Sequence, residues 1–87
     1  MNWLIYDSNY WIEAVALEKI NNHEIVVLER NKDIFTIRHA KNENDWLYNQ
    51  AAYVNEPILA DKYGKAIPID IKTGDLCRCL IVDVVIK

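Results

Sequence analysis

Residues 12–40, IEAVALEKINNHEIVVLERNKDIFTIRHA, decide the fold that this sequence predicts. Two turns that contain asparagine, Asn21-Asn22 and Asn31-Lys32, divide the stretch into three runs rich in apolar residues. Asn tolerates the positive φ that tight two-residue hairpin turns require. The stretch therefore predicts a three-stranded antiparallel meander that reverses at these two turns.

The two turns also set a register, and that register gathers apolar side chains on one face. Folding at the first turn places Leu17 opposite Val26, and folding at the second places Leu28 opposite Phe35. A shift of one residue would send these side chains to the other face, so the pattern specifies the pairing. The predicted apolar face consists of Val15, Leu17, Val26, Leu28, Phe35 and Ile37. The charged residues at one end of this face are Lys19, Glu24 and His39.

A helix is the alternative for the first run. Residues 9–20 include Ala, Leu and Glu, which favour helices. The run has no capping box at its start and no Gly at its end, and a helix would abolish the match across the strands. We therefore expect residues 10–20 to form a strand, preceded by a short edge strand over residues 1–6.

The second half of the chain predicts one helix. Asp45 can cap its start, and Asn55 can end it. Leu47, Ala51 and Val54 share one side of such a helix, at the spacing i, i+4, i+7. We therefore expect a helix over residues 45–55.

After the helix the sequence predicts a loop and then a β-hairpin. The loop covers residues 56–65, and its glycine marks a turn. Residues 66–71 alternate in polarity but include Pro68, which cannot donate an amide hydrogen bond, so they predict an edge strand. A turn at residues 72–75 leads into a long strand rich in Val and Ile over residues 76–86.

These elements define the expected fold class. The chain is predicted to be mainly β, of the α+β type, with residues 1–87 forming a single domain. The order is a three-stranded meander, a helix and a β-hairpin, in a small antiparallel barrel or a curved sheet. This is an OB-like order, although an analogy at the level of the fold says little about function.

Composition and charge restrict the classes of function. The chain carries 13 Asp and Glu against 10 Lys and Arg, without a basic block of the kind that binds nucleic acid. The N-terminus lacks the pattern of a signal peptide, and the apolar runs are too short to cross a membrane. Cys77 and Cys79 are neighbours at i and i+2 on a strand, where the Cα atoms lie near the upper distance limit for a disulfide. We therefore expect a cytoplasmic protein, since thiols stay reduced there.

The sequence contains no catalytic, cofactor-binding or metal-binding motif that we recognise. Two cysteines separated by one residue lack the paired spacing of a zinc site, and we interpret them as small residues of a β core. His23 and His39 face opposite sides of the predicted sheet, so no Cys–His nucleophile pair is expected. The 2 glycines cannot build a phosphate-binding loop. The sequence therefore predicts a protein that is not an enzyme and needs no cofactor or metal.

Aromatic residues are the remaining lead to a function. The chain has 3 Trp, 5 Tyr and 1 Phe, a large number for the interior of an 87-residue domain. Trp and Tyr are enriched at the energetic centres of protein interfaces, although packing between the meander and the helix would also account for them. The candidate interface residues are Trp3, Tyr6, Tyr10, Trp11, Trp46 and Tyr48.

We therefore expect a small, non-catalytic binding or adaptor domain that acts through protein–protein contacts, with a partner or with itself as a homodimer. Its small size suits an accessory protein of a phage or mobile element. The alternative is an OB-like protein that binds single-stranded nucleic acid, in which bases stack on aromatic rings and cations follow the phosphates. The candidate cations are Arg30, Lys32, Arg38 and Lys41. Arg30 and Arg38 face opposite sides in the predicted register, which weakens this alternative.

Overall fold

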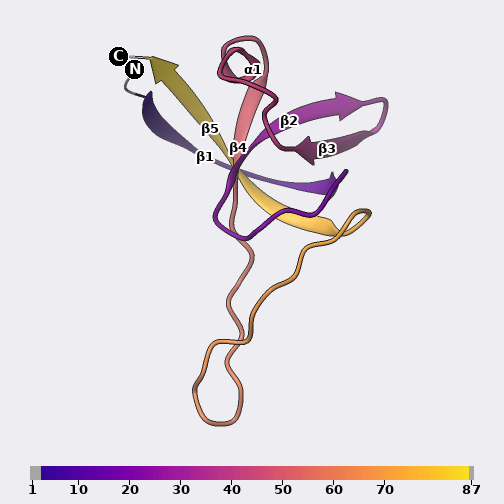
Figure 1. Cartoon of the computed structure of the whole chain (residues 1–87), viewed down its shortest axis with the longest axis vertical. Coiled ribbons are helices and arrows are strands. Elements are labelled where there is room, and N and C mark those ends of the chain that lie inside the picture. Colours follow the sequence, from indigo (N-terminus) through magenta and orange to yellow (C-terminus); the bar gives the residue numbers. More distant parts are fainter. Residues whose placement is uncertain (1–2, 87) are drawn as a thin grey trace.

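The computed structural model describes residues 3–86, and the side chains of residues 4–85. This part of the chain is mainly β (Figure 1). Its elements are β1 (Trp3–Ala16), β2 (Ile25–Asn31), β3 (Ile34–Arg38), α1 (Asn44–Tyr48), β4 (Gln50–Val54) and β5 (Leu76–Ile86).

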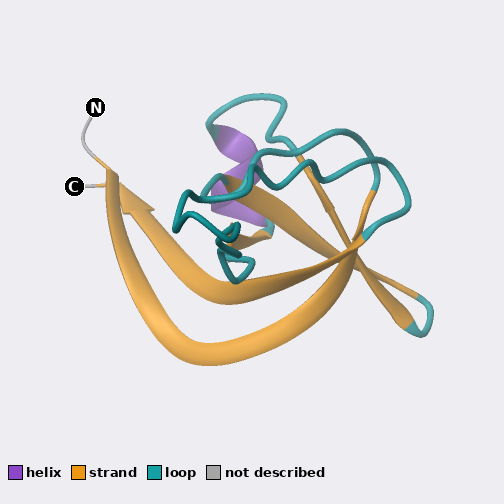
Figure 2. Cartoon of the chain, turned by 90° about the horizontal axis from the view of Figure 1, so that it is seen from below, coloured by secondary structure: helices purple, strands orange, loops and turns teal. Residues whose placement is uncertain are grey.

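The strands form one mixed five-stranded sheet in the order β1-β3-β2-β4-β5, and β5 pairs again with β1, so the pairings close into a ring. All pairings are antiparallel except the one between β1 and β3, which joins Val15 to Thr36 and Ala16 to Ile37. The two longest strands, β1 and β5, run side by side and bend together (Figure 2).

The predicted meander is wrong for its first strand. Residues 10–16 do form a strand as expected, but β1 pairs with β5 and β3 instead of β2. A β-turn does form at Asn22-His23, where the N–H of Glu24 donates to the carbonyl of Asn21 at 3.4 Å, but it does not close a hairpin, because β1 and β2 are not paired. The reason is the length of the partner: β5 offers β1 ten paired residues, whereas β2 is a 7-residue strand. The OB-like order rested on this meander, which the first three strands do not form.

The change of partner also reverses the face that β1 turns inward. Ala14 and Ala16 are fully buried inside the ring, whereas Leu17, predicted for the apolar face, is half exposed. The interior of a small closed sheet is narrow, so small residues alternate there with large ones. Ala14 and Ala16 fit beside the buried Ile37, and Val15 is only partly buried on the outside.

The hairpin of β2 and β3 is confirmed, but its turn is Lys32-Asp33, one residue later than predicted. Lys32 takes the positive φ of 58°. Leu28 therefore pairs with Ile37 instead of Phe35. The residue that pairs with Leu28 thus lies two positions further along β3 than predicted, and a shift of two keeps every side chain on its predicted face. Val26, Leu28, Phe35 and Ile37 accordingly belong to the core.

The predicted helix over residues 45–55 is wrong in its second half. Only Asn44–Tyr48 is helical, and Gln50–Val54 forms β4, which pairs with β2 on one side and β5 on the other. Both faces of β4 are buried, one through Ala51 and the other through Ala52 and Val54. The helical preference of Ala is weak compared with the gain from pairing on both edges.

Residues 57–68 project from the sheet as a long exposed arm (Figure 1), whereas Ile69 and Ile71 pack against the core. The predicted turns are confirmed, with Gly64 at φ 82° and Gly74 at φ 91°. The predicted strand over residues 66–71 is wrong: only the isolated bridges of Ala66 with Ala60 and of Ile71 with Ile20 occur there. The final strand, Leu76–Ile86, has the predicted limits.

Candidate functional site

The two cysteines fill the core, as the sequence predicts. Cys77 and Cys79 are free thiols buried inside the ring. Burial raises the pKa of Cys77 to about 11, with smaller contributions from Glu56 and Asp75. Burial also raises the pKa of Cys79 to about 12, with smaller contributions from Cys77 and Glu56. A thiol must ionise to act as a nucleophile, so both are poor nucleophiles. Over the described part of the chain, no group of three His, Cys, Asp or Glu side chains could hold a metal ion.

A first polar cluster joins the connection between β1 and β2 to the end of β3. We call it the His39 cluster: Glu18, Glu24 and His39. The imidazole lies between two carboxylates, with Nδ1 2.7 Å from Glu18 Oε1 and Nε2 2.9 Å from Glu24 Oε2. The sequence predicted Glu24 and His39 at one end of a face, but with Lys19 instead of Glu18. The register that placed Lys19 there assumed a strand through residue 20, whereas β1 ends at Ala16.

The His39 cluster shifts the pKa of each of its members. The hydrogen bond to Glu18, and then the one to Glu24, raise the pKa of His39. The hydrogen bond from His39 lowers the pKa of Glu18. Partial burial works to raise the pKa of Glu24, but hydrogen bonds from His39 and Asn21 outweigh it and lower the pKa. The cluster is therefore most stable with the imidazole protonated and both carboxylates ionised.

The His39 cluster should make stability depend on pH. Because the pKa of His39 is raised in the folded state above its ordinary 6.5, its stabilisation is complete below pH 6.5 and is lost as pH rises through the folded pKa. The ring is partly exposed, so we expect a loss of at most about 1 kcal/mol. Urea unfolding from pH 6 to about pH 9 should show this decline in the wild type and not in His39→Gln. His23→Gln, which removes an imidazole outside the cluster, should keep the decline; its disappearance there would contradict the assignment.

A second polar cluster fastens α1 to the hairpin of β2 and β3. The guanidinium of Arg38 donates from Nε to Glu29 at 2.8 Å, and from Nη1 and Nη2 to the two oxygens of Asp45 at 3.0 and 3.3 Å. This two-point contact is the strongest geometry for a carboxylate. Asp45 also accepts the N–H of Lys41 at 2.6 Å, so it does not cap α1 as predicted. The hydrogen bonds from Arg38 and Lys41 lower the pKa of Asp45.

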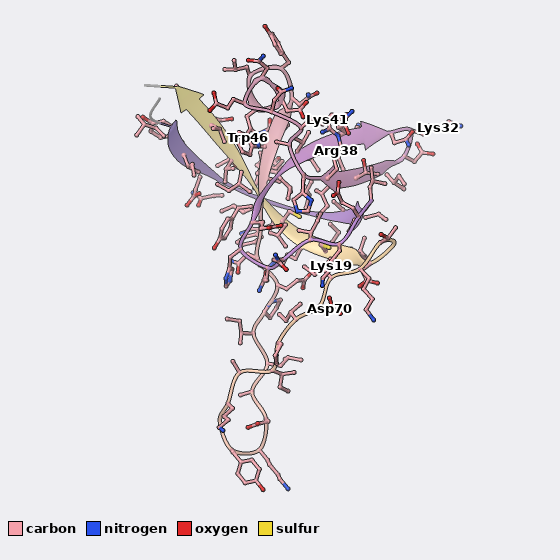
Figure 3. The ribbon with its side chains drawn as sticks, viewed as in Figure 1. Lys19, Lys32, Arg38, Lys41, Trp46 and Asp70 are labelled. Atoms are coloured by element: carbon pink, nitrogen blue, oxygen red, sulfur yellow. The ribbon has the colours of Figure 1, made fainter. Side chains whose placement is uncertain are left out.

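The structure does not gather the predicted nucleic-acid residues on one surface. Arg38 is held internally by Glu29 and Asp45. Arg30 lies over the ring of Phe35 at 5.8 Å from its centre and donates to the carbonyl of Lys32. In Figure 3, Lys32 lies at the tip of the hairpin, away from Arg38 and Lys41. Arg38, the least exposed of the four cations, is engaged with carboxylates.

A groove with an apolar floor lies on the outer face of β5, β4 and β2. It consists of two adjoining hollows, of about 180 and 370 Å³, that share Ile5 and Ile25. Its floor includes the buried side chains of Leu80 and Val82. We call this the outer groove, and its lining residues are Ile5, Asp7, Trp11, Ile25, Trp46, Tyr53, Asn55, Leu80, Val82 and Val84.

A β-bulge in β1 shapes one wall of the outer groove. The register with β5 shifts between Asp7 and Trp11. Ser8 Oγ donates to the carbonyl of Ile81 at 2.7 Å and accepts the N–H of Tyr10 at 3.1 Å, while Asn9 takes φ 63°. Bulges bend a strand, and this bend lets the end of β1 contribute Ile5 to the same hollow as Ile25 of β2.

The predicted interface residues divide between the outer groove and other surfaces. Trp11 and Trp46 both line the groove, from β1 and α1, and Trp46 is labelled in Figure 3. Tyr6, Tyr10 and Tyr48 are exposed but do not line it. The side chain of Trp3 lies outside the described residues.

Sequence reasoning missed the aliphatic part of the outer groove. Leu80, Val82 and Val84 alternate along β5 with residues that face the core, such as Cys79 and Ile81. A strand with several consecutive apolar residues has apolar surface on both faces. The run CLIV at residues 79–82 of β5 was the signal in the sequence for a second apolar surface.

No protein-family model, curated protein or solved structure matches this chain. Among the described residues, no helix has the length and apolar character needed to cross a membrane.

Proposed function

We propose that this chain is a non-catalytic binding domain that holds an apolar segment of a partner protein in the outer groove. The observation that carries the proposal is the pair of adjoining hollows, which Trp11 and Trp46 line from two different elements. Protein interfaces are typically centred on Trp and Tyr side chains that fill or border such hollows.

Charge supports a protein ligand in preference to single-stranded nucleic acid. Asp7 is the charged residue among those that line the outer groove, and a carboxylate repels phosphates. Arg38, which the nucleic-acid alternative requires, is paired with two carboxylates. A segment of a partner with large apolar side chains and a basic residue near Asp7 complements the groove better.

Two neighbouring aromatic residues allow a matched test of this proposal. Trp11 lines the outer groove, whereas Tyr10 is more exposed and lies outside it. Trp11→Ala should reduce affinity for the captured partner by about thirtyfold, as expected for a residue worth about 2 kcal/mol at an interface. Tyr10→Ala should bind as the wild type does.

The measurement is capture of partners from an extract of the native cell, followed by titration of the purified partner with each variant. Trp fluorescence reports binding directly, because Trp11 and Trp46 line the outer groove. Thermal unfolding of both variants checks that they remain folded. Equal affinity of Trp11→Ala and the wild type would contradict the proposal.

A further inference from the structure

Beyond the groove, the ends of β1 and β5 form a two-stranded ribbon that continues past the rest of the sheet. We call residues 3–7 and 82–86 the terminal ribbon. Five residue pairs join its strands, from Trp3 with Ile86 to Asp7 with Val82. Figures 1 and 2 show this ribbon curving away from the other strands. β4 pairs with β5 only as far as Val82, so the ribbon is supported by a neighbouring strand at one end alone.

The outer edge of β1 is open along the terminal ribbon. β3 pairs with β1 only at Val15 and Ala16, and within residues 3–86 no other strand lies beside that edge. An open edge presents backbone N–H and C=O groups that can pair with a further strand. A two-stranded ribbon is only marginally stable in water, and three or more strands are needed for independent stability. The open edge is therefore suited to pairing with an extended peptide strand.

The side chains of the terminal ribbon leave that edge unprotected. Ile5, Tyr6 and Val85 are each about half exposed, on both faces of the ribbon. Natural edge strands are usually shielded by charged side chains, above all Lys, or by Pro or a bulge. The segment WLIYD, residues 3–7, contains no Lys and no Pro; its one charged residue, Asp7, stands at its end, and the bulge begins only after it.

We infer that the edge of β1 over residues 3–7 pairs antiparallel with the same edge of a second copy of the chain, centred on Ile5. This register places Ile5 opposite Ile5 of the second copy, Leu4 opposite Tyr6, and Trp3 opposite Asp7. Leu4, Ile5 and Tyr6 then oppose apolar or aromatic residues, which stabilises a ladder, and Asp7 does not face another carboxylate. Centring the pairing on Asp7 would instead oppose two carboxylates, which is destabilising. The sequence of the edge thus complements itself.

The pairing joins the two terminal ribbons into one continuous four-stranded sheet. In this sheet, the side chains of Ile5 and Asp7 of both copies point to the same face. Both outer grooves then lie on that face, since Ile5 and Asp7 line the groove. The self-association does not require the groove to bind a partner. The dimer does allow a partner with two apolar segments to bind both grooves at once, which raises the effective affinity of that partner.

The first test measures molar mass by light scattering and sedimentation from about 1 µM to about 1 mM. The wild type should shift from monomer to dimer with concentration. Ile5→Lys should raise the dissociation constant by about tenfold or more, because it opposes two ammonium groups at the centre of the pairing. Ile34→Lys is the matched control, since Ile34 and Ile5 are both 50% exposed and Ile34 lies on the distant hairpin. It should dimerise as the wild type does.

Charge reversal then tests the register. An equal mixture of Ile5→Lys and Ile5→Glu should restore the dimer, while each variant alone stays weaker than the wild type. Amide hydrogen exchange of the wild type is a second readout that needs no variant: the amides of residues 3–7 should gain protection as concentration rises.

A wild type that remains a monomer throughout would overturn the inference, as would dimerisation of Ile5→Lys at the wild-type affinity, failure of the mixture to restore the dimer, or exchange rates independent of concentration. Trp11→Ala separates this inference from the proposed function. It should dimerise normally while it loses the partner of the outer groove.

Discussion

Ile37→Ala is expected to lower the free energy of unfolding by about 2–5 kcal/mol. Ile37 has no exposed surface, and it pairs with Leu28 of β2 and with Ala16 of β1. It therefore lies where β3 closes the ring against β1, at the shortest of the strand pairings. Removal of its side chain leaves a cavity in a thin core, and the neighbouring alanines cannot expand to fill it. The loss is a large share of the roughly 5–15 kcal/mol that stabilises a domain.

Urea unfolding followed by circular dichroism measures this effect. Ile34→Ala is the control, because Ile34 belongs to the same strand but is 50% exposed. Its loss should stay below about 1 kcal/mol, since little apolar area is returned to water. Equal losses for the two variants would mean that β3 does not turn Ile37 inward.

Arg38→Ala is expected to destabilise the fold by about 1.5–3 kcal/mol, the range for hydrogen bonds to charged groups. The side chains of Arg38 and Asp45 are both 16% exposed, so solvent screens this pair only in part. The contact to Glu29, whose side chain is 40% exposed, adds less. Without the guanidinium, Asp45 loses two hydrogen bonds and α1 loses its main tie to the hairpin.

Two comparisons test that assignment by urea unfolding. Arg30→Ala removes an exposed guanidinium that lies over Phe35 and should cost below about 1 kcal/mol. Arg38→Lys keeps the charge but cannot contact both oxygens of Asp45, so its loss should fall between those of the two alanine variants. An Arg38→Ala protein as stable as Arg30→Ala would show that the second cluster does not hold α1 in place.

Local signals in the sequence determined a definite part of this protein. Alternation along β2 and β3 predicted that Val26, Leu28, Phe35 and Ile37 share the core face, and a two-residue change of register left that result intact. The limits of β5 and the turns at Gly64 and Gly74 were also predicted correctly. Each of these features depends on the backbone preferences and the side-chain period of a few neighbouring residues, which can be read from the sequence.

The sequence predicted only some of the residues of the candidate site. We predicted Trp11 and Trp46 as interface residues because large aromatic side chains left on a protein surface often mark a binding site. Their meeting in one groove required the bulge at residues 8–10 and the docking of α1 through Arg38 and Asp45. Ile5 and Ile25, which connect the two hollows, come from strands that are not neighbours in the sheet. No spacing along the chain encodes that contact.

Tertiary structure alone decided the partner of β1, the face it buries and the identity of residues 50–54 as a strand. A hairpin between residues 12–20 and 23–30 had the advantage of a short loop, yet β1 pairs with a strand about sixty residues away. Closing a loop of that length costs about 3 kcal/mol more in entropy than closing a two-residue turn. The ten paired residues and the burial of the core offset that cost. The sequence by itself determined which segments can be strands, and the closure of the ring decided which of them meet.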